Sequence, residues 1–497
     1  MKIMAAGIFG KKALIGTMSC ALLLIGKPVS AASDTGDVVG KVIVGYQGWF
    51  NAAGDGSPMA NWQKWVGDGA APGPNNMIVS IYPDTREYPV LFQTGLANLG
   101  NGQPAKLFSS YTAQTIDLHF QWMQTYGIDG AALQRFTSSG SYQKNADSVS
   151  ARMMRAAEKY GRKFYIMYDI SQMGTNFDQT VEQDWTNTIV NSLHLIGSPA
   201  YAKQNGKTVV CLWGLGFNDG VHPGDSTQSK NFVTWFKNQG LFVIGGVPTY
   251  WRTCTNDSKP GFQNVYKTFN MIEPWLVGRE NSLASCDDFK NNVIGPDWTY
   301  CQANGMDYAP VMFPGFAWGD LTKPRNEIPR LHGDFMWRQA YNIRTLGIPS
   351  AYIAMFDECN EGTAILKAAE NASMIPTNRY FLTLDADGIA CSSDFYLRLA
   401  GDATKMIKGV TPAVSAHPTA HNTPLNTISG HDTRSMAQSH QAYAIRIIDL
   451  SGRIIRSVNS NRAEASPAFL LRGCAQGLYV AQVYQGTILT KAMMVCK

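Results

Sequence analysis

The sequence predicts an α/β fold, a (β/α)8 TIM barrel followed by a small antiparallel β-sandwich, and three observations lead to this prediction. Between residue 41 and about residue 356, eight short apolar runs alternate with amphipathic or polar stretches, at a spacing that suits strand–helix units. Several of these stretches stop at a glycine, as helices commonly do. From residue 442 the chain changes to short alternating strands with glycine turns, which is typical of a sandwich.

The eight apolar runs supply the expected strands in chain order. They are 42–46, 77–82, 130–133, 164–168, 208–212, 241–247, 309–313 and 351–356. Helices are expected at 113–126, 145–160 and 333–346, each stopped by the glycine that follows it. Alternating strands and helices build a parallel sheet. An open doubly wound sheet is the alternative, but no GxGxxG follows the first run.

The chain is expected to divide into four segments. Residues 1–31 have a basic start, an apolar run and small residues before a polar stretch, which predicts a signal peptide. Its apolar run is shorter than the ~20 residues that span a membrane, and no later stretch reaches that length. A barrel is expected at 37–408, a Pro-, Thr-, Ser- and Ala-rich linker at 409–441, and the sandwich at 442–497.

The composition excludes several classes of function. Charged residues make up only 16% of the 497, and the net charge of +5 includes lysines of the expected leader, so no nucleic-acid-binding surface is indicated. CxxC, HExxH and zinc-like spacings are absent, and we expect neither a metal nor an organic cofactor. Export would permit disulfides among the cysteines outside the leader, but their pairing stays open.

Three carboxylates follow the last expected strand, at Asp357, Glu358 and Glu361. Cleavage of a glycosidic bond typically needs two carboxyl groups, one to donate a proton and one to act as base or nucleophile. Glu358 and Glu361 can converge only if the strand ends near residue 356 and the chain then turns. The alternative is that these acids favour the N-terminus of a helix at 364–371.

Aromatic and polar residues at the other strand ends predict a carbohydrate-binding surface. In a barrel the site lies at the C-terminal ends of the strands. Sugar rings stack on aromatic rings, while polar side chains hold the hydroxyls; core packing is the alternative for each aromatic residue. The candidate substrate-binding residues are Tyr46, Trp49, Gln134, Arg135, Tyr168, Asp169, Trp213, Trp251, Trp318 and Asp357.

Over residues 41 to about 408 the sequence resembles bacterial proteins similar to glycoside hydrolase families 71 and 99, which are α-glycanases on (β/α)8 barrels. The matching segments are 44–50 (VGYQGWF), 82–88 (YPDTREY), 126–130 (YGIDG), 134–136 (QRF), 354–358 (AMFDE), 361–363 (EGT), 384–388 (LDADG) and 396–401 (YLRLAG). Family 99 carries its two glutamates as Glu-Trp-His-Glu-Gly; here the same spacing reads Glu358-Cys359-Asn360-Glu361-Gly362.

The resemblance implies roles for the two glutamates. Glu358 would deprotonate the sugar 2-hydroxyl, which then attacks its own anomeric carbon. Glu361 would protonate the leaving oxygen and later activate water. The expected function is therefore a secreted glycoside hydrolase acting on an α-linked polysaccharide or glycan, with α-mannan-like substrates favoured. The alternative is a non-catalytic glycan-binding protein on the same barrel.

The tail resembles the C-terminal sorting domain of the type IX secretion system. The matching segments are 448–453 (IDLSGR), 476–480 (QGLYV) and 489–495 (LTKAMMV). This resemblance implies that secretion machinery is a partner and that the protein is secreted or held at the cell surface. A carbohydrate-binding or spacer module is the alternative for this tail.

Overall fold

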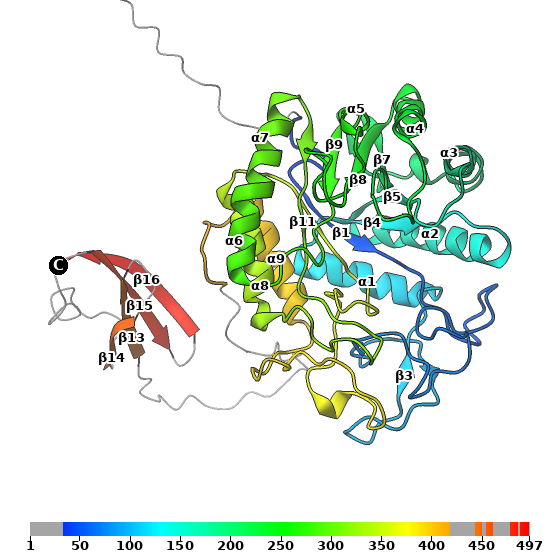
Figure 1. Cartoon of the computed structure of the whole chain (residues 1–497). Coiled ribbons are helices and arrows are strands. Elements are labelled where there is room, and N and C mark those ends of the chain that lie inside the picture. The colour runs from blue at the N-terminus through cyan, green and yellow to red at the C-terminus, as the bar shows by residue number, and fades with distance from the viewer. Residues whose placement is uncertain (1–32, 418–442, 450–453, 461–477, 486–487, 497) are drawn as a thin grey trace, which may run out of the picture. The chain divides into compact units, whose positions relative to one another are not determined.

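The computed structural model describes residues 33–417 and, in the tail, 443–449, 454–460, 478–485 and 488–496 (Figure 1). The expected signal peptide and most of the expected linker lie outside the described residues. The chain divides into two compact units. Apart from residues 390–392, which belong with the second unit, the first unit extends to residue 416.

A parallel sheet forms the centre of the first unit. Its strands follow the order β10-β9-β8-β7-β5-β4-β1-β12-β11, and every pairing along this order is parallel. Because such a sheet is covered on both faces, its strands are mostly apolar, and β1, β4 and β8 are buried at every residue. The strands are β1 Val42–Tyr46, β4 Gly130–Arg135, β5 Lys163–Asp169, β7 Lys207–Trp213, β8 Phe242–Val247, β9 Met271–Pro274, β10 Asp307–Tyr308, β11 Val311–Met312 and β12 Ala351–Ile353.

The two ends of this strand order meet in one short segment. β10 and β11 are separated by two residues only, and the first pairs with β9 whereas the second pairs with β12. The amide of Ala309 also donates to the carbonyl of Ile272 on β9, and the carbonyl of Pro310 accepts from Tyr352 on β12. The sheet therefore curls round on itself, and the first unit has an α/β fold like a TIM barrel.

One of the eight expected strands does not form, and one strand of the sheet was not predicted. Residues 77–82 form only isolated bridges, and the amides of Ser80 and Ile81 donate to the carbonyl of Cys359 in a loop instead of joining the sheet. The strand that the sequence did not predict is β9, which joins the sheet between β8 and β10. It is a run of four residues that contains Glu273 and ends at Pro274. A charged residue and a proline within so short a run hide it from an apolar pattern.

The expected helices are present with small shifts at their ends. α1 spans Ala113–Tyr126 as predicted, and it ends at Gly127, whose φ of 77° is the left-handed conformation that glycine adopts without strain. α2 starts earlier than expected, and no helix forms at 364–371. The other helices are α2 Gly140–Tyr160, α3 Phe177–Gln183, η1 Asp184–Ser192, η2 Leu195–Gly197, α4 Ser226–Asn238, α5 Gln263–Tyr266, α6 Leu283–Phe289, η3 Lys290–Ile294, α7 Gly295–Ala303, η4 Leu331–Gly333, α8 Asp334–Thr345, η5 Ala372–Met374 and α9 Phe395–Ile407.

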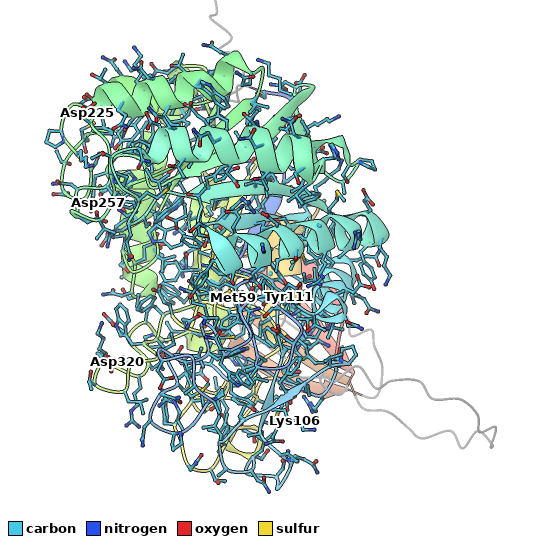
Figure 2. All side chains as sticks on the ribbon, turned by 90° about the vertical axis from the view of Figure 1, so that its right-hand side faces the viewer. Met59, Lys106, Tyr111, Asp225, Asp257 and Asp320 are labelled. Atoms are coloured by element: carbon cyan, nitrogen blue, oxygen red, sulfur yellow. The ribbon has the colours of Figure 1, made fainter. Side chains whose placement is uncertain are left out.

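Long irregular loops complete the first unit. Figure 2 shows those labelled at Lys106 and Asp320 below the helices that cover the sheet. They contain the two-stranded sheet of β2 (Phe92–Gln93) and β3 (Lys106–Leu107), while β6 (Lys203–Gln204) pairs with β7. Across the described residues, no helix has the length and apolar character needed to cross a membrane.

The described part of the tail contains one antiparallel sheet of four strands. Its order is β14-β13-β15-β16, and the strands are β13 Tyr443–Asp449, β14 Ile454–Ser460, β15 Leu478–Gln485 and β16 Ile488–Cys496. The further strand expected at 468–471 lies outside the described residues. The antiparallel arrangement agrees with the alternating pattern of this region, and the expected two-sheet sandwich stays a prediction.

Candidate active site

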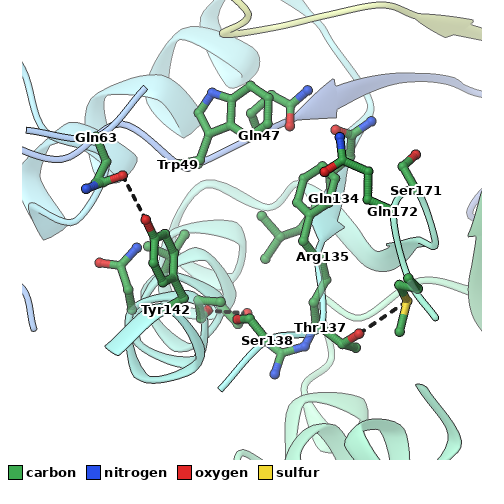
Figure 3. Close-up of a pocket in the computed structure, with 18 of the residues that line it drawn as sticks. Gln47, Trp49, Gln63, Gln134, Arg135, Thr137, Ser138, Tyr142, Ser171 and Gln172 are labelled. Atoms are coloured by element: carbon green, nitrogen blue, oxygen red, sulfur yellow. Dashed lines mark hydrogen bonds between the residues drawn. The ribbon is translucent and has the colours of Figure 1, made fainter. Parts of the chain in front are cut away.

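A cavity of about 570 Å³ opens at the C-terminal ends of three neighbouring strands. Its lining includes residues 47–49 after β1, residues 134–138 at the end of β4 and residues 171–174 after β5 (Figure 3). Trp49 stacks on Phe136 at one wall, with ring centroids 5.7 Å apart and an angle of 18° between the planes. This end of a barrel is where active sites of such folds lie.

Glu358 is held beside this cavity by two hydrogen bonds. Its Oε1 accepts from Nε2 of Gln47, a cavity-lining residue, at 3.0 Å, and its Oε2 accepts from the hydroxyl of Thr363 at 2.8 Å. Burial, followed by the negative charge of Glu361, raises the pKa of Glu358. Glu358 therefore has a fixed orientation and a strong tendency to hold a proton.

The chain makes the turn that convergence of the two glutamates requires. β12 ends at Ile353, Gly362 has a φ of 68°, and the amide of Ala364 donates back to the carbonyl of Glu358 at 3.2 Å. Glu361 is half-buried, and burial raises its pKa while the positive charge of Lys323 opposes the shift. Since no helix begins here, the acids are not explained as a helix N-terminus.

Asp357 holds the turn after β1. Its two oxygens accept from the backbone amides of Gln47 at 2.7 Å and Gly48 at 2.9 Å, and the side chain is fully buried. Burial raises the pKa of Asp357 to about 6, while these two amides favour its ionised form. Asp357 was expected to bind substrate, but the structure uses both of its oxygens to position Gln47, which in turn holds Glu358.

Lys64 brings a positive charge to the carboxylates. Its Nζ lies 4.1 Å from the centroid of the Trp49 ring, and it lines the cavity. Burial lowers the pKa of Lys64, whereas Glu358 and Asp169 favour its charged form. Lys64 has a φ of 63°, and its carbonyl accepts from Nδ2 of Asn360, between the two glutamates, at 2.8 Å. The glutamate loop thus helps to hold the backbone of Lys64.

Several buried polar atoms at the cavity have no hydrogen-bond partner among the described residues. They are Oε1 of Gln47, Nε1 of Trp49 and Nη1 of Arg135, all on cavity-lining residues. Buried polar atoms are almost always hydrogen-bonded in native proteins. These three atoms are themselves buried from solvent, so they do not by themselves define a ligand position.

Asp169 stands at the end of β5 beside the cavity-lining Ser171. Its Oδ1 accepts from the amide of Ser171 at 2.8 Å and from the Ser171 hydroxyl at 2.5 Å. Burial raises the pKa of Asp169, while hydrogen bonds from Ser171 and the charges of His222 and Lys64 oppose the shift. Gln134 of β4, which pairs in register with Met167 of β5, lines the cavity directly.

Of the six expected substrate-binding aromatics, Trp49 lines the cavity and the other five do not, and three of these five are hydrogen-bonded to helices. Tyr46 hydrogen-bonds His119 of α1 at 2.9 Å, Tyr168 donates to Asp184 of η1 at 2.8 Å, and Nε1 of Trp251 donates to Asp297 of α7 at 2.8 Å. Successive strand residues face opposite sides of a sheet, so Tyr168 points toward the helices when Asp169 points inward. Tyr46, Tyr168 and Trp251 are therefore bound to helices and do not face this cavity.

Three further candidates, Arg135, Trp213 and Trp318, lie in three different parts of the structure. Arg135 lines the cavity, but its guanidinium also forms a buried ion pair with Asp184 and contacts Asp147. Trp213 packs against His222 and Trp275. Trp318 lies next to Ala317, whose amide donates to the carbonyl of Glu361, and Lys323 lies 3.9 Å from its ring centroid. Trp318 thus belongs to the Glu361 side of the site.

Sequence reasoning missed Lys64, Ser171 and His222. Ser171 follows β5 by two residues, so inspection of strand ends could have found it. Lys64 lies in an irregular loop with no periodic pattern, and nothing local marks it. Within the described part of the chain, no group of three or more His, Cys, Asp or Glu side chains could hold a metal ion.

Comparisons with known proteins agree with this architecture. No protein-family model and no curated protein sequence matches the chain. Two solved structures of the GH99 endo-alpha-mannosidase from Bacteroides thetaiotaomicron are similar in fold, with TM-scores of 0.52 for one and 0.54 for the complex with bis-tris-propane. Each is 13% identical and covers 75% of this chain and 98% of its own. The expected glycoside hydrolase-like fold is confirmed.

Proposed function

We propose that this protein is a glycoside hydrolase that cleaves an α-linked polysaccharide or glycan, with Glu358 and Glu361 as its catalytic pair. The observation that supports this most directly is the cavity at the C-terminal ends of β1, β4 and β5, whose lining residue Gln47 donates a hydrogen bond to Glu358. A sugar hydroxyl both donates and accepts hydrogen bonds, and the Trp49–Phe136 wall offers an aromatic surface for a ring.

The two glutamates have suitable chemistry for the two proton transfers. In the proposed reaction Glu358 takes the proton of the 2-hydroxyl, whose oxygen attacks the anomeric carbon as the glycosidic bond breaks. Glu361 gives its proton to the leaving oxygen and afterwards accepts one from the water that opens the cyclic intermediate. A carboxylate with a raised pKa is a stronger base, and a raised pKa favours the protonated form of a carboxyl group that must donate a proton.

The charges around Glu358 and Glu361 decide which of the two glutamates holds a proton, and the proposed roles depend on this. In the free protein, the deeper burial of Glu358 and the positive charge of Lys323 near Glu361 favour the shared proton on Glu358. The base role requires Glu358 to be ionised, which the positive charge of Lys64 promotes. Substrate binding must therefore shift this proton toward Glu361 before the reaction begins.

An α-mannan-like substrate is favoured because the similar solved structures are those of an endo-alpha-mannosidase. The test is hydrolysis by the purified protein of a panel of α-mannans, α-glucans and host-type glycans, followed by reducing-end release. Turnover of one α-linked class supports the proposal. Tight binding of a glycan without turnover would favour a glycan-binding protein instead.

We also propose that the protein is exported and that its tail is recognised by secretion machinery. The sequence motifs of the tail and the antiparallel sheet of β13–β16 support this idea. Because sorting domains of this kind are removed after passage, protein recovered from the native host should begin near Ala32 and lack most of residues 408–497. Intact-mass measurement decides the matter, and a mature species that still ends at Lys497 would favour a permanent binding or spacer module.

A further inference from the structure

Four polar side chains form a continuous hydrogen-bonded chain from the cavity to the exterior. Oδ1 of Asp169 lies 2.5 Å from the Ser171 hydroxyl, which lies 2.9 Å from Nε2 of His222. Nδ1 of His222 lies 2.7 Å from Oδ2 of Asp219. The side chain of His222 is 6% exposed and that of Asp219 is 43% exposed, so the outer end of the chain meets solvent.

The hydrogens of these four side chains can be arranged along the hydrogen bonds in two ways. The Ser171 hydroxyl has one hydrogen, which it can give to Asp169 or to His222, but not to both. When both ring nitrogens of His222 carry protons, Nε2 donates to Ser171 and the hydroxyl donates to Asp169. When His222 is neutral with its proton on Nδ1, toward Asp219, its bare Nε2 becomes a second acceptor that competes with Asp169 for the Ser171 hydrogen.

Ser171 is not arranged as a nucleophile, although serine, histidine and aspartate occur here in the order of a hydrolytic triad. Acyl transfer needs backbone amides that are free to bind an oxyanion. The amide of Ser171 donates to Asp169, and the amide of Gln172 donates to the carbonyl of Val221. A carboxylate 2.5 Å from the hydroxyl would also repel the developing negative charge.

We propose that Ser171 and His222 are positioning residues. Protonated His222 turns the Ser171 hydroxyl toward Asp169, and this hydroxyl holds the ionised Asp169 carboxylate in place for a substrate hydroxyl. Loss of the His222 proton releases the Asp169 carboxylate. This inference rests on the proposed glycan-binding function of the cavity. Among the described residues no hydrogen bond reaches Oδ2 of Asp169, which leaves that oxygen for a ligand.

The surrounding groups define the direction of the pH effect. Asp169 faces the positive charges of Lys64 and His222 and the buried thiol of Cys211. His222 faces Asp219, the rings of Trp213 and Phe217, and Lys259, whose Nζ donates to the His222 carbonyl at 2.9 Å. The ordered arrangement requires a proton on both ring nitrogens of His222, so a rise in pH that removes one of them acts against it.

The first test uses glycan affinity in the Glu361→Gln background, so that turnover does not interfere. An α-mannan oligosaccharide should bind more weakly as the pH rises from 5.5 to 8, by about tenfold, the usual worth of a charge-assisted hydrogen bond. His222→Gln should remove this transition, because an amide donates to Ser171 at every pH. Ser171→Ala should bind about tenfold more weakly at low pH, and Ser171→Thr should restore affinity.

His194→Gln is the matched control, because His194 is exposed and, among the described residues, its ring hydrogen-bonds to the carbonyl of Val190 in the preceding helical turn and to no side chain. It should keep the transition. A transition that survives in His222→Gln, or unchanged affinity in Ser171→Ala, would overturn the proposal.

The second test needs no glycan and separates this inference from the proposed function. In protein with ¹⁵N-labelled histidine, the ring signals of His222 should show the remaining proton on Nδ1 after titration, and Ser171→Ala should shift the Nε2 signal. A neutral ring protonated on Nε2 would refute the chain. The expected ring signals together with no binding or hydrolysis of any glycan would refute the proposed function alone.

Discussion

Replacement of each glutamate by glutamine separates catalysis from binding. Glu361→Gln keeps the size of the side chain but removes the transferable proton, and among the described residues no hydrogen bond to its carboxylate is lost. Glu358→Gln is also compatible with the fold: its carbonyl oxygen can accept from Gln47, and its amide can donate to the Thr363 hydroxyl, which turns round. Both variants should therefore fold and bind glycan.

The expected loss of activity is large. General acid–base catalysis contributes about 10² to 10⁴-fold, so kcat should fall by at least about 10²-fold in each variant, a barrier increase of about 3 kcal/mol. The assay is kcat from reducing-end release, with affinity measured by calorimetry on the same preparations. Glu158→Gln, an exposed position on α2, is the control and should keep full activity. Unchanged hydrolysis in either catalytic variant would remove that residue from the mechanism.

Substrates with altered reactivity then decide the role of each glutamate. A dinitrophenyl leaving group departs without protonation, so it should restore activity to the variant that lacks the acid and not to the one that lacks the base. Rescue of Glu361→Gln supports the proposed roles, and rescue of Glu358→Gln would reverse them. A substrate without the 2-hydroxyl should be cleaved poorly by the unmutated enzyme. A trapped covalent glycosyl adduct would instead show that a carboxylate is the nucleophile.

Two further predictions concern charge. Lys64→Met removes the positive charge that favours ionised Glu358, so the acidic limb of the kcat/KM profile should move to higher pH by about one unit. Lys64→Arg should keep the acidic limb where it is. No shift in Lys64→Met would mean that Lys64 does not act on the base. Arg135→Met leaves the carboxylate of Asp184 buried without its ion-pair partner. Urea titration should therefore show a loss of about 3–5 kcal/mol in the free energy of unfolding. A loss below about 1 kcal/mol would contradict this account.

The parts of the fold that the sequence predicts well are those set by local rules. Continuous apolar runs became the buried strands β1, β4, β5, β7 and β8, and glycines in the left-handed conformation ended α1 and α2 at the expected residues. The run 77–82 failed because apolar residues also pack against loops, here the Cys359 carbonyl, and a run by itself does not say which partner accepts its hydrogen bonds.

The site was harder to predict because the direction of a side chain depends on the strand's register. Both Tyr168 and Asp169 stand at the end of β5, yet alternation allows only one of them to face inward, and hydrophobicity alone does not say which. The structure shows that Tyr168 packs between Trp185 and Phe236. Lys64 could not be found at all, since its place depends on contacts between loops that are far apart in the sequence.

The two residues between the glutamates give this site a character of its own. Cys359 and Asn360 stand where the family that the motif resembles has tryptophan and histidine. The Cys359 carbonyl accepts from the amides of Ser80 and Ile81, and Nδ2 of Asn360 donates to the Lys64 carbonyl at 2.8 Å. A positive φ is unfavourable for a lysine, so such outside contacts are needed to keep Lys64 in that conformation.

The loop between the glutamates thus has a structural part at this site. It binds two neighbouring segments through their backbones and holds the segment that carries a cation near Glu358 and Asp169. The positive charge that favours the ionised form of Glu358 thus comes from Lys64, which is far from the glutamates in the sequence. Because such a cation also lies in the cavity that would receive the sugar, substrate preference here should depend on Lys64 as much as on the glutamates.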